Sequence, residues 1–429
     1  MKFFEWSVMP ALVAGGLALA TNMAQAANTA GTLDTNFGNG GSVTNTLIPQ
    51  ANDSSIALPE GLGFQSNGDI LLMVGVTITG ANASSTTQVL RYTPAGVLDI
   101  TFGSNGIAVL PTTFEGFAMA IDSSNRIVIA GDSSATEDLA AARLTANGAL
   151  DTTFGSGGIA TTNQSCCGEG GAVVIEPATV GTGANDILFC GGLFPTGRRQ
   201  PSTTVLARWT SSGQLDPNFG SGGIVHIVGP GGCTAVAVLS TGEILDANGT
   251  TAQFEANGTL ESSASGGAVV ASATINSPET TLFQPNSDFV VAQALFVGEE
   301  SRGHNSSVEV LRFTATGAAD STFAEPSFHF EGSGGTDIQA VPDAIALQSN
   351  GDIVVVGGQT MFAQSGTTTI DGIARLTPNG DLDPTFGSGG IAITPTSGNL
   401  AAIDSQGRII VAGEAGSDTQ VVVSRYLGQ

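Results

Sequence analysis

Arginine and aspartate recur together along this chain, and their side chains are the first candidates for chemistry. A guanidinium meets a carboxylate through two parallel hydrogen bonds, so each pair could form one of several repeated binding sites or hold two chain segments together. The aspartates stand in full or worn copies of the stretch Leu-Asp-x-x-Phe-Gly, and the arginines end a short apolar segment. The aspartates are Asp34, Asp99, Asp151, Asp216, Asp320 and Asp383, and the arginines are Arg91, Arg143, Arg208, Arg312, Arg375 and Arg425.

One unit of the chain favours the structural role over the binding role. Where Gln253 replaces the arginine, the same unit also loses the aspartate and the phenylalanine and reads Leu260-Glu-Ser-Ser. The joint loss indicates that Arg, Asp and Phe act together inside each unit. Partly buried charges need such partners. We therefore predict an ion pair between the arginine and the aspartate of the following turn, with the phenylalanine packed beside it.

The other reactive side chains form no recognisable catalytic or metal-binding pattern. His226, His304 and His329 lack the His-x-His and His-Glu-x-x-His spacings of zinc sites, and there is no Asp-x-Asp-x-Asp-Gly calcium loop. No Gly-x-Ser-x-Gly nucleophile elbow occurs. We expect no catalytic residue and no cofactor, with a divalent cation as the alternative.

The elements that position these residues come from a repeat of about 45 to 65 residues, a period typical of solenoids and propellers. Each unit begins with a short alternating segment such as Ala344–Leu347, followed by a turn such as Asn350-Gly-Asp. A continuous apolar run such as Ile353–Gly357 comes next, then a segment that ends in the arginine, and then the motif turn with a fourth strand. Four antiparallel strands per unit predict the blade of an all-β propeller.

The arginine position counts seven units, the fourth of them degenerate at Gln253. The last unit lacks a fourth strand, and the chain begins with a fourth strand around residues 37–43 that has nothing before it. We predict a seven-bladed propeller of four-stranded antiparallel blades. Its ring is closed when the N-terminal strand joins the sheet formed by residues 397–427, which removes an exposed edge.

Two stretches of the sequence resemble the bacterial delta-60 repeat family, and more loosely the NHL repeat. They are the motif Leu-Asp-x-x-Phe-Gly-x-x-Gly and the segment Asn-Gly-Asp-Ile-Val-Val-Val-Gly-Gly at residues 350–358. The resemblance covers roughly residues 30–429 and five or six of seven copies; the fourth unit departs from it. It implies a secreted or surface propeller. It implies no activity, because the family offers no shared catalytic residues to carry over.

The N-terminus predicts export. Lys2 precedes the apolar run Val8–Ala20, and Ala24-Gln-Ala26 has the form of a cleavage site, so residues 1–26 are expected to be a signal peptide and residues 27–429 a single propeller domain. The run is short for a membrane span, and we expect no membrane insertion after cleavage. The predicted location is secreted, periplasmic or on the cell surface.

The charge excludes one class of partner. The chain has a net charge of −25, and its only basic residues downstream of Lys2 are arginines. Nucleic-acid surfaces need clustered Lys and Arg, so we expect no nucleic-acid binding. Cations, basic partners or simple solubility outside the cell fit the acidity.

The four cysteines, an even number in an exported chain, indicate disulfide bonds. The strand pattern places all four towards one rim of two neighbouring units, and two local disulfides are the preferred interpretation. A vicinal pair and free thiols are the alternatives. No Cys-x-x-Cys spacing supports metal binding or redox catalysis. The residues are Cys166, Cys167, Cys190 and Cys233.

Loops on one rim are the candidates for ligand binding. The connections from the fourth to the first strand and from the second to the third should share one face, here called the upper rim; the motif turns occupy the opposite face, the lower rim. Carboxylates such as Glu60 and Glu414 outnumber arginines on the upper rim. Functional residues favour loops on a rigid scaffold, although these loops could be ordinary solvated ones. The candidates are Glu115, Glu169, Arg198, Arg199, Glu299, Glu300, Arg302 and Asp337.

These observations predict a non-enzymatic binding or scaffold protein that recognises an unknown glycan or protein ligand through its upper rim. We expect it to be a monomer. One alternative is a propeller lyase or hydrolase that uses carboxylates at the channel mouth, with or without a divalent cation, and a second is a purely structural surface protein. The fold alone cannot choose among them, since propellers serve many unrelated functions.

Overall fold

A computed structural model describes the chain from residue 29 onwards, with internal gaps. The predicted signal peptide therefore lies outside the described residues. The described ranges are 29–47, 55–79, 83–134, 138–165, 171–177, 183–193, 203–228, 233, 235–239, 242–247, 251–260, 278–296, 305–315, 317–331, 338–363 and 366–429.

Strands are the only regular elements in these ranges, and the predicted all-β class is confirmed. No segment there forms a helix with the length and hydrophobicity of a membrane span. Three sheets each hold four strands that follow one another in the chain. They comprise β2 (Ile56–Phe64), β3 (Ile70–Ile78), β4 (Ser84–Tyr92) and β5 (Ile107–Val109); β6 (Phe114–Ile121), β7 (Ile127–Ser133), β8 (Asp138–Leu144) and β9 (Ile159–Ser165); and β10 (Gly171–Ile175), β11 (Ile187–Leu193), β12 (Thr203–Trp209) and β13 (Ile224–Val228).

The fourth unit contributes a sheet of three described strands, and the next two units share one sheet. The three-stranded sheet holds β14 (Ala235–Val238), β15 (Ile244–Ala247) and β16 (Thr251–Phe254). The shared sheet holds β17 (Pro278–Phe283), β18 (Phe289–Phe296), β19 (Asn305–Phe313), β20 (Ser327–Phe328), β21 (Ile338–Leu347), β22 (Ile353–Ala363), β23 (Gly366–Leu376) and β24 (Ile391–Thr394).

The shared sheet exists because β20 is only two residues long and leaves the upper part of β19 without a partner. The first residues of β21 take that place through the parallel pairs Asn305↔Ile338 and Ser306↔Gln339. The Ser306 hydroxyl also accepts from the Ala340 amide and donates to its carbonyl, each at 3.0 Å. A side chain thus continues the ladder where backbone pairing ends.

The two ends of the chain meet in the remaining four-stranded sheet. It holds β1 (Ser42–Thr46), β27 (Ser417–Tyr426), β26 (Ile409–Ala415) and β25 (Leu400–Ile403), in that order. β1 runs antiparallel to β27 from Ser42↔Ser424 to Thr46↔Gln420. Residues at the start of the described chain therefore supply an edge strand to the last sheet.

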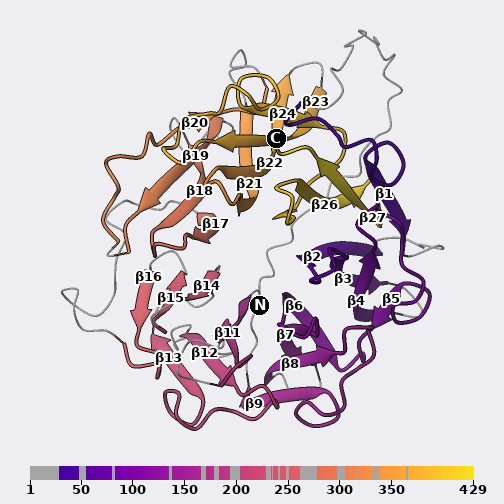
Figure 1. The fold of residues 1–429 in the computed structure, drawn as a ribbon, viewed down its shortest axis with the longest axis vertical. Helices are drawn as coiled ribbons and strands as arrows, with labels where there is room; N and C mark the ends of the chain where they lie inside the picture. Colours follow the sequence, from indigo (N-terminus) through magenta and orange to yellow (C-terminus); the bar gives the residue numbers. More distant parts are fainter. Residues whose placement is uncertain are drawn as a thin grey trace.

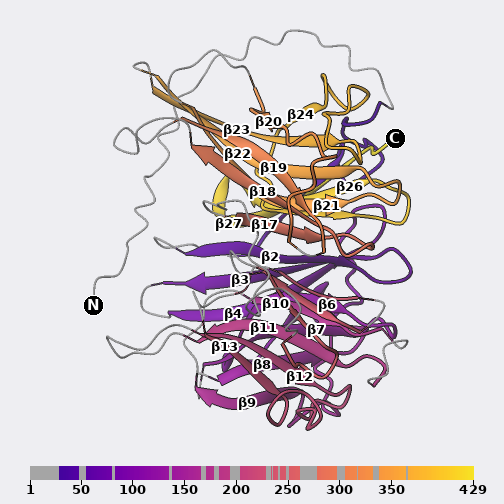
Figure 2. The ribbon, with the colours of Figure 1, turned by 90° about the vertical axis from the view of Figure 1, so that its left-hand side faces the viewer.

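The sheets stand around a common centre, with the first strand of each unit innermost (Figure 1). Seen from the side, the strands of neighbouring sheets lie one above another (Figure 2). The apolar runs of the second strands explain this stacking, since residues such as Leu71, Leu72 and Met73 of β3 are 0% exposed on both faces of the sheet. Hydrophobic clusters join adjacent sheets, as where Ile410 and Val423 pack against Leu72 and Leu90. This is the architecture of a β-propeller.

Backbone geometry requires glycine at two positions of the motif turn. Gly387 and Gly390 have φ angles of 53° and 101°, which L-residues with a side chain rarely adopt. A Cβ at Gly387 would lie 2.1 Å from the Ile391 carbonyl oxygen. The turn can therefore close against the fourth strand only when glycine occupies these positions.

Candidate functional site

The lower rim carries the repeated arginine and aspartate, and the structure brings them together in six units. A guanidinium NH2 or Nε lies 2.7 to 2.8 Å from one aspartate oxygen in each pair. The guanidinium carbon stands 4.5 to 4.8 Å from the centre of the motif phenylalanine ring, within the range of a cation–π contact. The pairs are Arg91–Asp99, Arg143–Asp151, Arg208–Asp216, Arg312–Asp320, Arg375–Asp383 and Arg425–Asp34.

The second aspartate oxygen is used inside the turn. In the sixth unit, Asp383 Oδ1 accepts from the amide of Thr385 at 2.9 Å and from its hydroxyl at 2.7 Å. Burial alone would raise the pKa of Asp383, but these hydrogen bonds and Arg375 outweigh it and lower that pKa. The carboxylate is therefore held ionised by its own turn as well as by its arginine.

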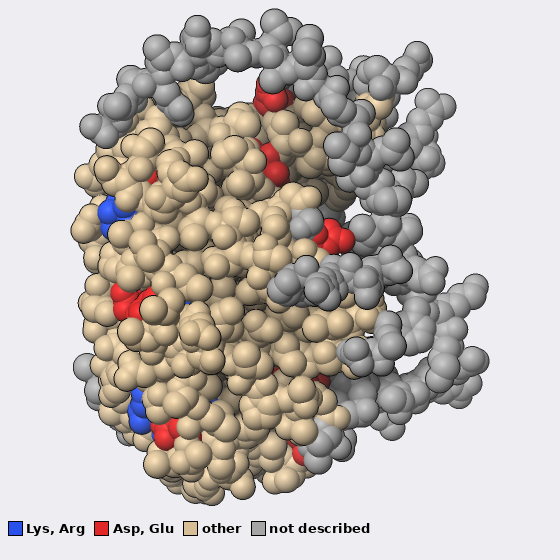
Figure 3. All heavy atoms as spheres, turned by 90° about the vertical axis from the view of Figure 1, so that its right-hand side faces the viewer, with Lys and Arg blue, Asp and Glu red and all other residues tan. Residues whose placement is uncertain are grey.

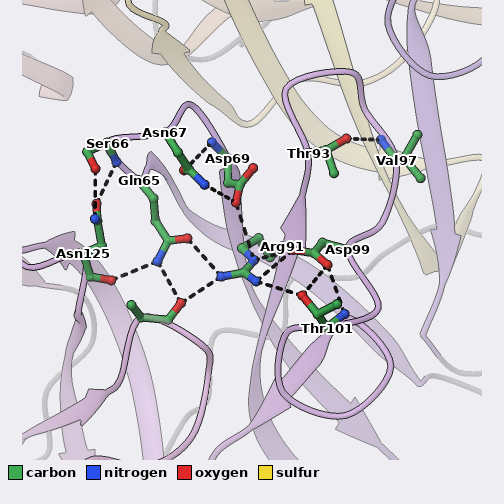
Figure 4. A network of polar contacts seen from close by, with 11 residues as sticks. Gln65, Ser66, Asn67, Asp69, Arg91, Thr93, Val97, Asp99, Thr101 and Asn125 are labelled. Carbon is green, nitrogen blue, oxygen red and sulfur yellow. Dashed lines mark hydrogen bonds and ion pairs between the residues drawn. The ribbon is translucent and has the colours of Figure 1, made fainter.

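Each arginine also donates to the neighbouring sheet. NH1 of Arg91 donates to the Ala146 carbonyl at 2.8 Å, and Arg143 makes the same bond to Ser211 at 2.5 Å. Figure 4 shows Arg91 at the centre of such a network, between Gln65, Asp99 and Thr101. The remaining bonds of this kind run from Arg208 to Ala256, Arg312 to Pro378, Arg375 to Gly428 and Arg425 to Pro94.

In these contacts the N–H donors of the guanidinium groups bind other atoms of the protein. Nε, NH1 and NH2 of Arg375 donate to Asp383, Gly428 and Thr385 respectively. The two other described arginines, Arg126 and Arg408, pair at 2.6 Å with Asp122 and Asp404 of their own hairpins. On the lower rim, the arginine contacts therefore join each motif turn to the third strand of its own unit and to the next sheet.

Of the residues that the sequence predicts to bind a ligand at the upper rim, the structure describes one. Glu115 is exposed near the start of β6, opposite Asp132 on β7. Seven of the eight candidates lie outside the described residues, so the structure does not show which of them come together. These seven are Glu169, Arg198, Arg199, Glu299, Glu300, Arg302 and Asp337.

Glu60, on the sheet before Glu115, is the most perturbed acid of the described rim. It sits at a bulge between Pro59 and Gly61 of β2, and its carboxylate lies over Gly75, where a Cβ would be 2.4 Å from Oε1. Oε2 is buried and has no hydrogen-bond partner among the described residues. Burial, and secondly the charge of Glu115, raise the pKa of Glu60 to about 8.

The bulge recurs in the innermost strands of four units. The extra residues are Glu60 in β2, Phe117 in β6, Glu279 in β17 and Asp343 in β21, so three of the four are acidic. Bulges re-aim a side chain and are frequent beside functional sites. The sequence signal for these bulges is an acidic or aromatic residue flanked by proline or small residues in an otherwise alternating strand. The strands predicted from the sequence do not include these bulges.

Two further acids of the upper half share the direction of the shift. Burial raises the pKa of Asp371 on β23, and burial together with the charge of Asp418 raises that of Glu414 at the end of β26. On the lower rim the pKa of each motif aspartate is lowered by its hydrogen bonds and its arginine, whereas burial raises the pKa of Asp186 in a neighbouring hairpin. Carboxylates of the upper half have no arginine partner in the described ranges.

A space-filling view shows where the charged side chains lie. Arginine atoms appear at one edge of the ring, whereas acidic atoms appear there and towards the opposite edge (Figure 3). Within the described ranges no group of three or more His, Cys, Asp or Glu side chains is placed to hold a metal ion. The carboxylates of the upper rim could accept hydrogen bonds or attract positive charge.

One of the predicted disulfides is present. Cys190 of β11 and Cys233, which precedes β14, are bonded with their Cα atoms 5.8 Å apart. The bond joins two neighbouring sheets; the sequence predicted disulfides among cysteines at one rim of adjacent units and left their pairing open. Cys166 and Cys167 lie outside the described residues.

Comparison with known proteins supports the fold and assigns no activity. Residues 123–154 and 348–386 match the family described as a domain of unknown function (DUF5122) beta-propeller. No curated protein matches the chain.

Solved structures resemble the chain at low identity. A protein of unknown function from Dyadobacter fermentans DSM 18053 has a TM-score of 0.44 at 9% identity, over 90% of this chain and 98% of its own. The polysaccharide lyase Uly1 has a TM-score of 0.44 at 8% identity, over 92% of each chain. The Penicillium chrysogenum alpha-L-arabinanase has a TM-score of 0.29 at 11% identity, over 90% of this chain and 99% of its own. From its sheets and the two matched segments, this chain is a β-propeller similar in part to the DUF5122 family.

Proposed function

We propose that this chain is an exported, non-enzymatic binding or scaffold protein that recognises a glycan or protein ligand through its upper rim. The observation that carries the proposal is that the described arginines are confined to the lower rim. All eight of them lie 2.6 to 2.8 Å from an aspartate of a lower-rim hairpin or motif turn. Upper-rim carboxylates such as Glu115 and Asp418 have no arginine beside them in the described ranges, and in a chain of net charge −25 they can attract positively charged or cation-bridged groups.

The scaffold that presents this rim is proposed to be a seven-bladed ring, with residues 1–26 removed as a signal peptide and residues 27–429 as the single domain. The eight-stranded sheet counts as two blades, because only the two parallel residue pairs between β19 and β21 join its halves. The pairing of β1 with β27 supports closure of the ring by the N-terminal strand. The repeats are proposed to be of the delta-60 type.

Thermal unfolding in the presence of probe ligands tests the proposal. A ligand that binds only the native state raises the melting temperature. The probes are Ca²⁺, Mg²⁺, poly-L-lysine and a glycan panel, each measured at low salt and at 0.5 M salt, since ionic contacts at an exposed rim weaken as salt rises. We expect at least one probe to raise the melting temperature, by an amount that falls in high salt if charge drives it.

Matched variants locate the site. Glu115→Gln with Asp418→Asn removes two exposed upper-rim charges, and Asp381→Asn with Glu255→Gln removes two exposed charges from lower-rim turns. We expect the first pair to abolish the shift and the second to leave it unchanged. Equal loss in both pairs, or no shift with any probe, would point instead to the purely structural surface protein.

A second candidate, a lyase or hydrolase, is favoured by one specific observation. The buried carboxyl of Glu60 has a pKa raised to about 8 and lies beside Glu115 on the next sheet, and a protonated acid beside an ionised one suits general acid–base work. This candidate predicts turnover of an acidic or neutral polysaccharide by the mature protein. Activity that Glu60→Gln removes and Glu115→Gln weakens would support it, and activity unchanged in Glu60→Gln would exclude this residue as the acid.

A further inference from the structure

The bond from a lower-rim arginine to the next sheet recurs around the ring. In each case the acceptor is the carbonyl at the same place in the turn after the next unit's third strand. Through it, each described arginine of the motif connects its own motif aspartate, its phenylalanine ring and the neighbouring sheet. We call this set of three contacts the latch.

One junction lacks the residues for a latch. Gln253 on β16 faces Leu245 of β15, as Arg208 on β12 faces Leu188 of β11, so Gln253 occupies the arginine position. The sequence has Glu261 where the other units have aspartate and Ala264 where they have phenylalanine. On the next sheet the corresponding acceptor is the carbonyl of Ala315, and no described arginine donates to it.

The same three-stranded sheet is held firmly on its other side. Arg208 donates to the Ala256 carbonyl at 2.5 Å and stands 4.5 Å from the ring centre of Phe219. The Cys190–Cys233 disulfide joins the same two sheets. The sheet of β14–β16, with strands of four residues each, is therefore anchored to the sheet before it by a latch and a disulfide, and the described residues form neither with the sheet after it.

The meeting point of the chain ends is better secured than this junction. β1 adds a five-residue ladder to β27, and Arg425 makes a full latch with Asp34, Phe37 and the carbonyl of Pro94. Deleting a guanidinium that is buried and paired is costly because it leaves an uncompensated charge, which makes each latch a barrier to separation. The ring is expected to open first where no latch exists.

We propose that the junction between the β14–β16 sheet and β17 is a seam at which the ring opens locally, and that the Cys190–Cys233 disulfide keeps the β14–β16 sheet attached when it does. Figure 1 shows β14 and β17 next to each other on the inner side of the ring. Opening at this seam separates the two sheets without breaking the closure between β1 and β27. The disulfide then limits the movement to one side of the β14–β16 sheet.

Amide hydrogen exchange of the mature, oxidised protein, read by mass spectrometry of peptides, tests the seam. Local openings give faster exchange in the segments they expose than global unfolding does. We expect peptides from β14–β17 to exchange at least tenfold faster than peptides from β2–β8, and the β1 and β27 peptides to match the slow set. Fastest exchange at β1 and β27, or equal protection of all sheets, would overturn the proposal.

Two transplanted motifs provide the matched controls. Gln253→Arg with Glu261→Asp and Ala264→Phe builds a latch at the seam, and should slow exchange in β14–β17 alone. Arg143→Gln with Asp151→Glu and Phe154→Ala copies the fourth unit into the second, and should create a new fast region at the junction of the β6–β9 and β10–β13 sheets. The second variant decides the matter if the first fails to fold, and exchange unchanged at that junction would contradict the role given to the latch.

The disulfide is tested separately. Cys190→Ala with Cys233→Ala should increase exchange of β14–β16 at least threefold beyond that of the oxidised protein, with little change in β2–β5. An increase spread evenly over all sheets would show that the bond stabilises the whole ring and does not retain this sheet in particular.

Discussion

Arg425 and Asp34, 391 residues apart in the sequence, form the same ion pair that the other units with both residues form between their third strand and the motif turn that follows it. The NH2 group of Arg425 lies 2.8 Å from Asp34 Oδ2, and in the sixth unit NH2 of Arg375 lies 2.7 Å from Asp383 Oδ2. The side chains of the terminal pair are only 4% and 9% exposed. The contact that ends each repeat thus also joins β27 to the segment before β1.

Removing one member of this terminal pair should destabilise the whole protein. Arg425→Gln removes the guanidinium from Asp34 Oδ2 and from the Pro94 carbonyl, and we expect a loss of about 3 kcal/mol in the free energy of unfolding, the usual cost of breaking a buried pair. Urea unfolding followed by circular dichroism measures it. Arg312→Gln is the matched control, because the Arg312–Asp320 pair is more exposed, at 13% and 15%, and should lose less. Equal losses would mean that burial does not set the strength of these pairs.

Deletion of residues 30–47 removes β1 and the Asp34 turn together. The last sheet would then expose the edge of β27 along the ladder from Ser424 to Gln420. We expect faster hydrogen exchange in β26 and β27 than in β3 and β7, and a lower melting temperature. Unchanged exchange in β27 would show that β1 does not stabilise this sheet.

Coupling within one unit can be measured by a double-mutant cycle on Asp383→Asn and Arg375→Gln. The two side chains share a hydrogen bond of 2.9 Å, so their effects on the free energy of unfolding should be non-additive by about 1 kcal/mol or more. Strictly additive losses would argue against an interacting pair. Asp383→Asn with Arg143→Gln, in different units, is the control that should be additive.

Much of this architecture could be predicted because the repeat carries side-chain signals. The alternation of apolar runs, Asn-Gly turns and the Leu-Asp-x-x-Phe-Gly stretch fixes strand order, and the joint loss at Gln253 points to the Arg–Asp–Phe contacts. The bond from Arg91 to Ala146 could not be predicted, since its acceptor is a backbone carbonyl and any residue supplies one. The parallel pairing of β19 with β21 depends on how short β20 is, which the worn motif at Ala319 does not reveal.

The upper rim is harder to predict for a different reason. Loops often carry function, but a loop sequence has no periodic pattern that shows which side chains come together. Glu60 gained its unusual environment from a one-residue bulge, which shifts the register of β2 and places the carboxylate over Gly75. A bulge is a property of two paired strands, so the sequence of one strand gives only a weak signal for it.

Glu60 should make the protein less stable as pH rises. Its pKa is raised from an ordinary 4.5 to about 8 in the folded state, so the folded protein holds this proton more tightly than the unfolded chain. The stability it contributes is full below pH 4.5, declines as pH rises towards 8, and is lost above that. Glu60→Gln should therefore be more stable than the parent at pH 8.5, by about 2 kcal/mol, and nearly equal at pH 4. Glu115→Gln should remove only the smaller, electrostatic part of the decline.

A substitution at Gly75 tests the same carboxyl independently, because it changes the space around the Glu60 side chain and leaves its charge in place. A methyl group at Gly75 would meet the far end of the Glu60 side chain, 2.4 Å from Oε1, and a flexible side chain can move aside. Gly75→Ala should push the carboxylate towards solvent, restore an ordinary pKa, and abolish the loss of stability between pH 4.5 and 8. Gly131→Ala on β7 is the matched control, because its Cβ would lie 1.8 Å from the backbone carbonyl oxygen of Glu115, which cannot yield. That variant should lose about 1–3 kcal/mol at every pH, as overpacked sites do. A Gly75→Ala protein that keeps the parent's pH dependence would show that burial over β3 is not what perturbs Glu60.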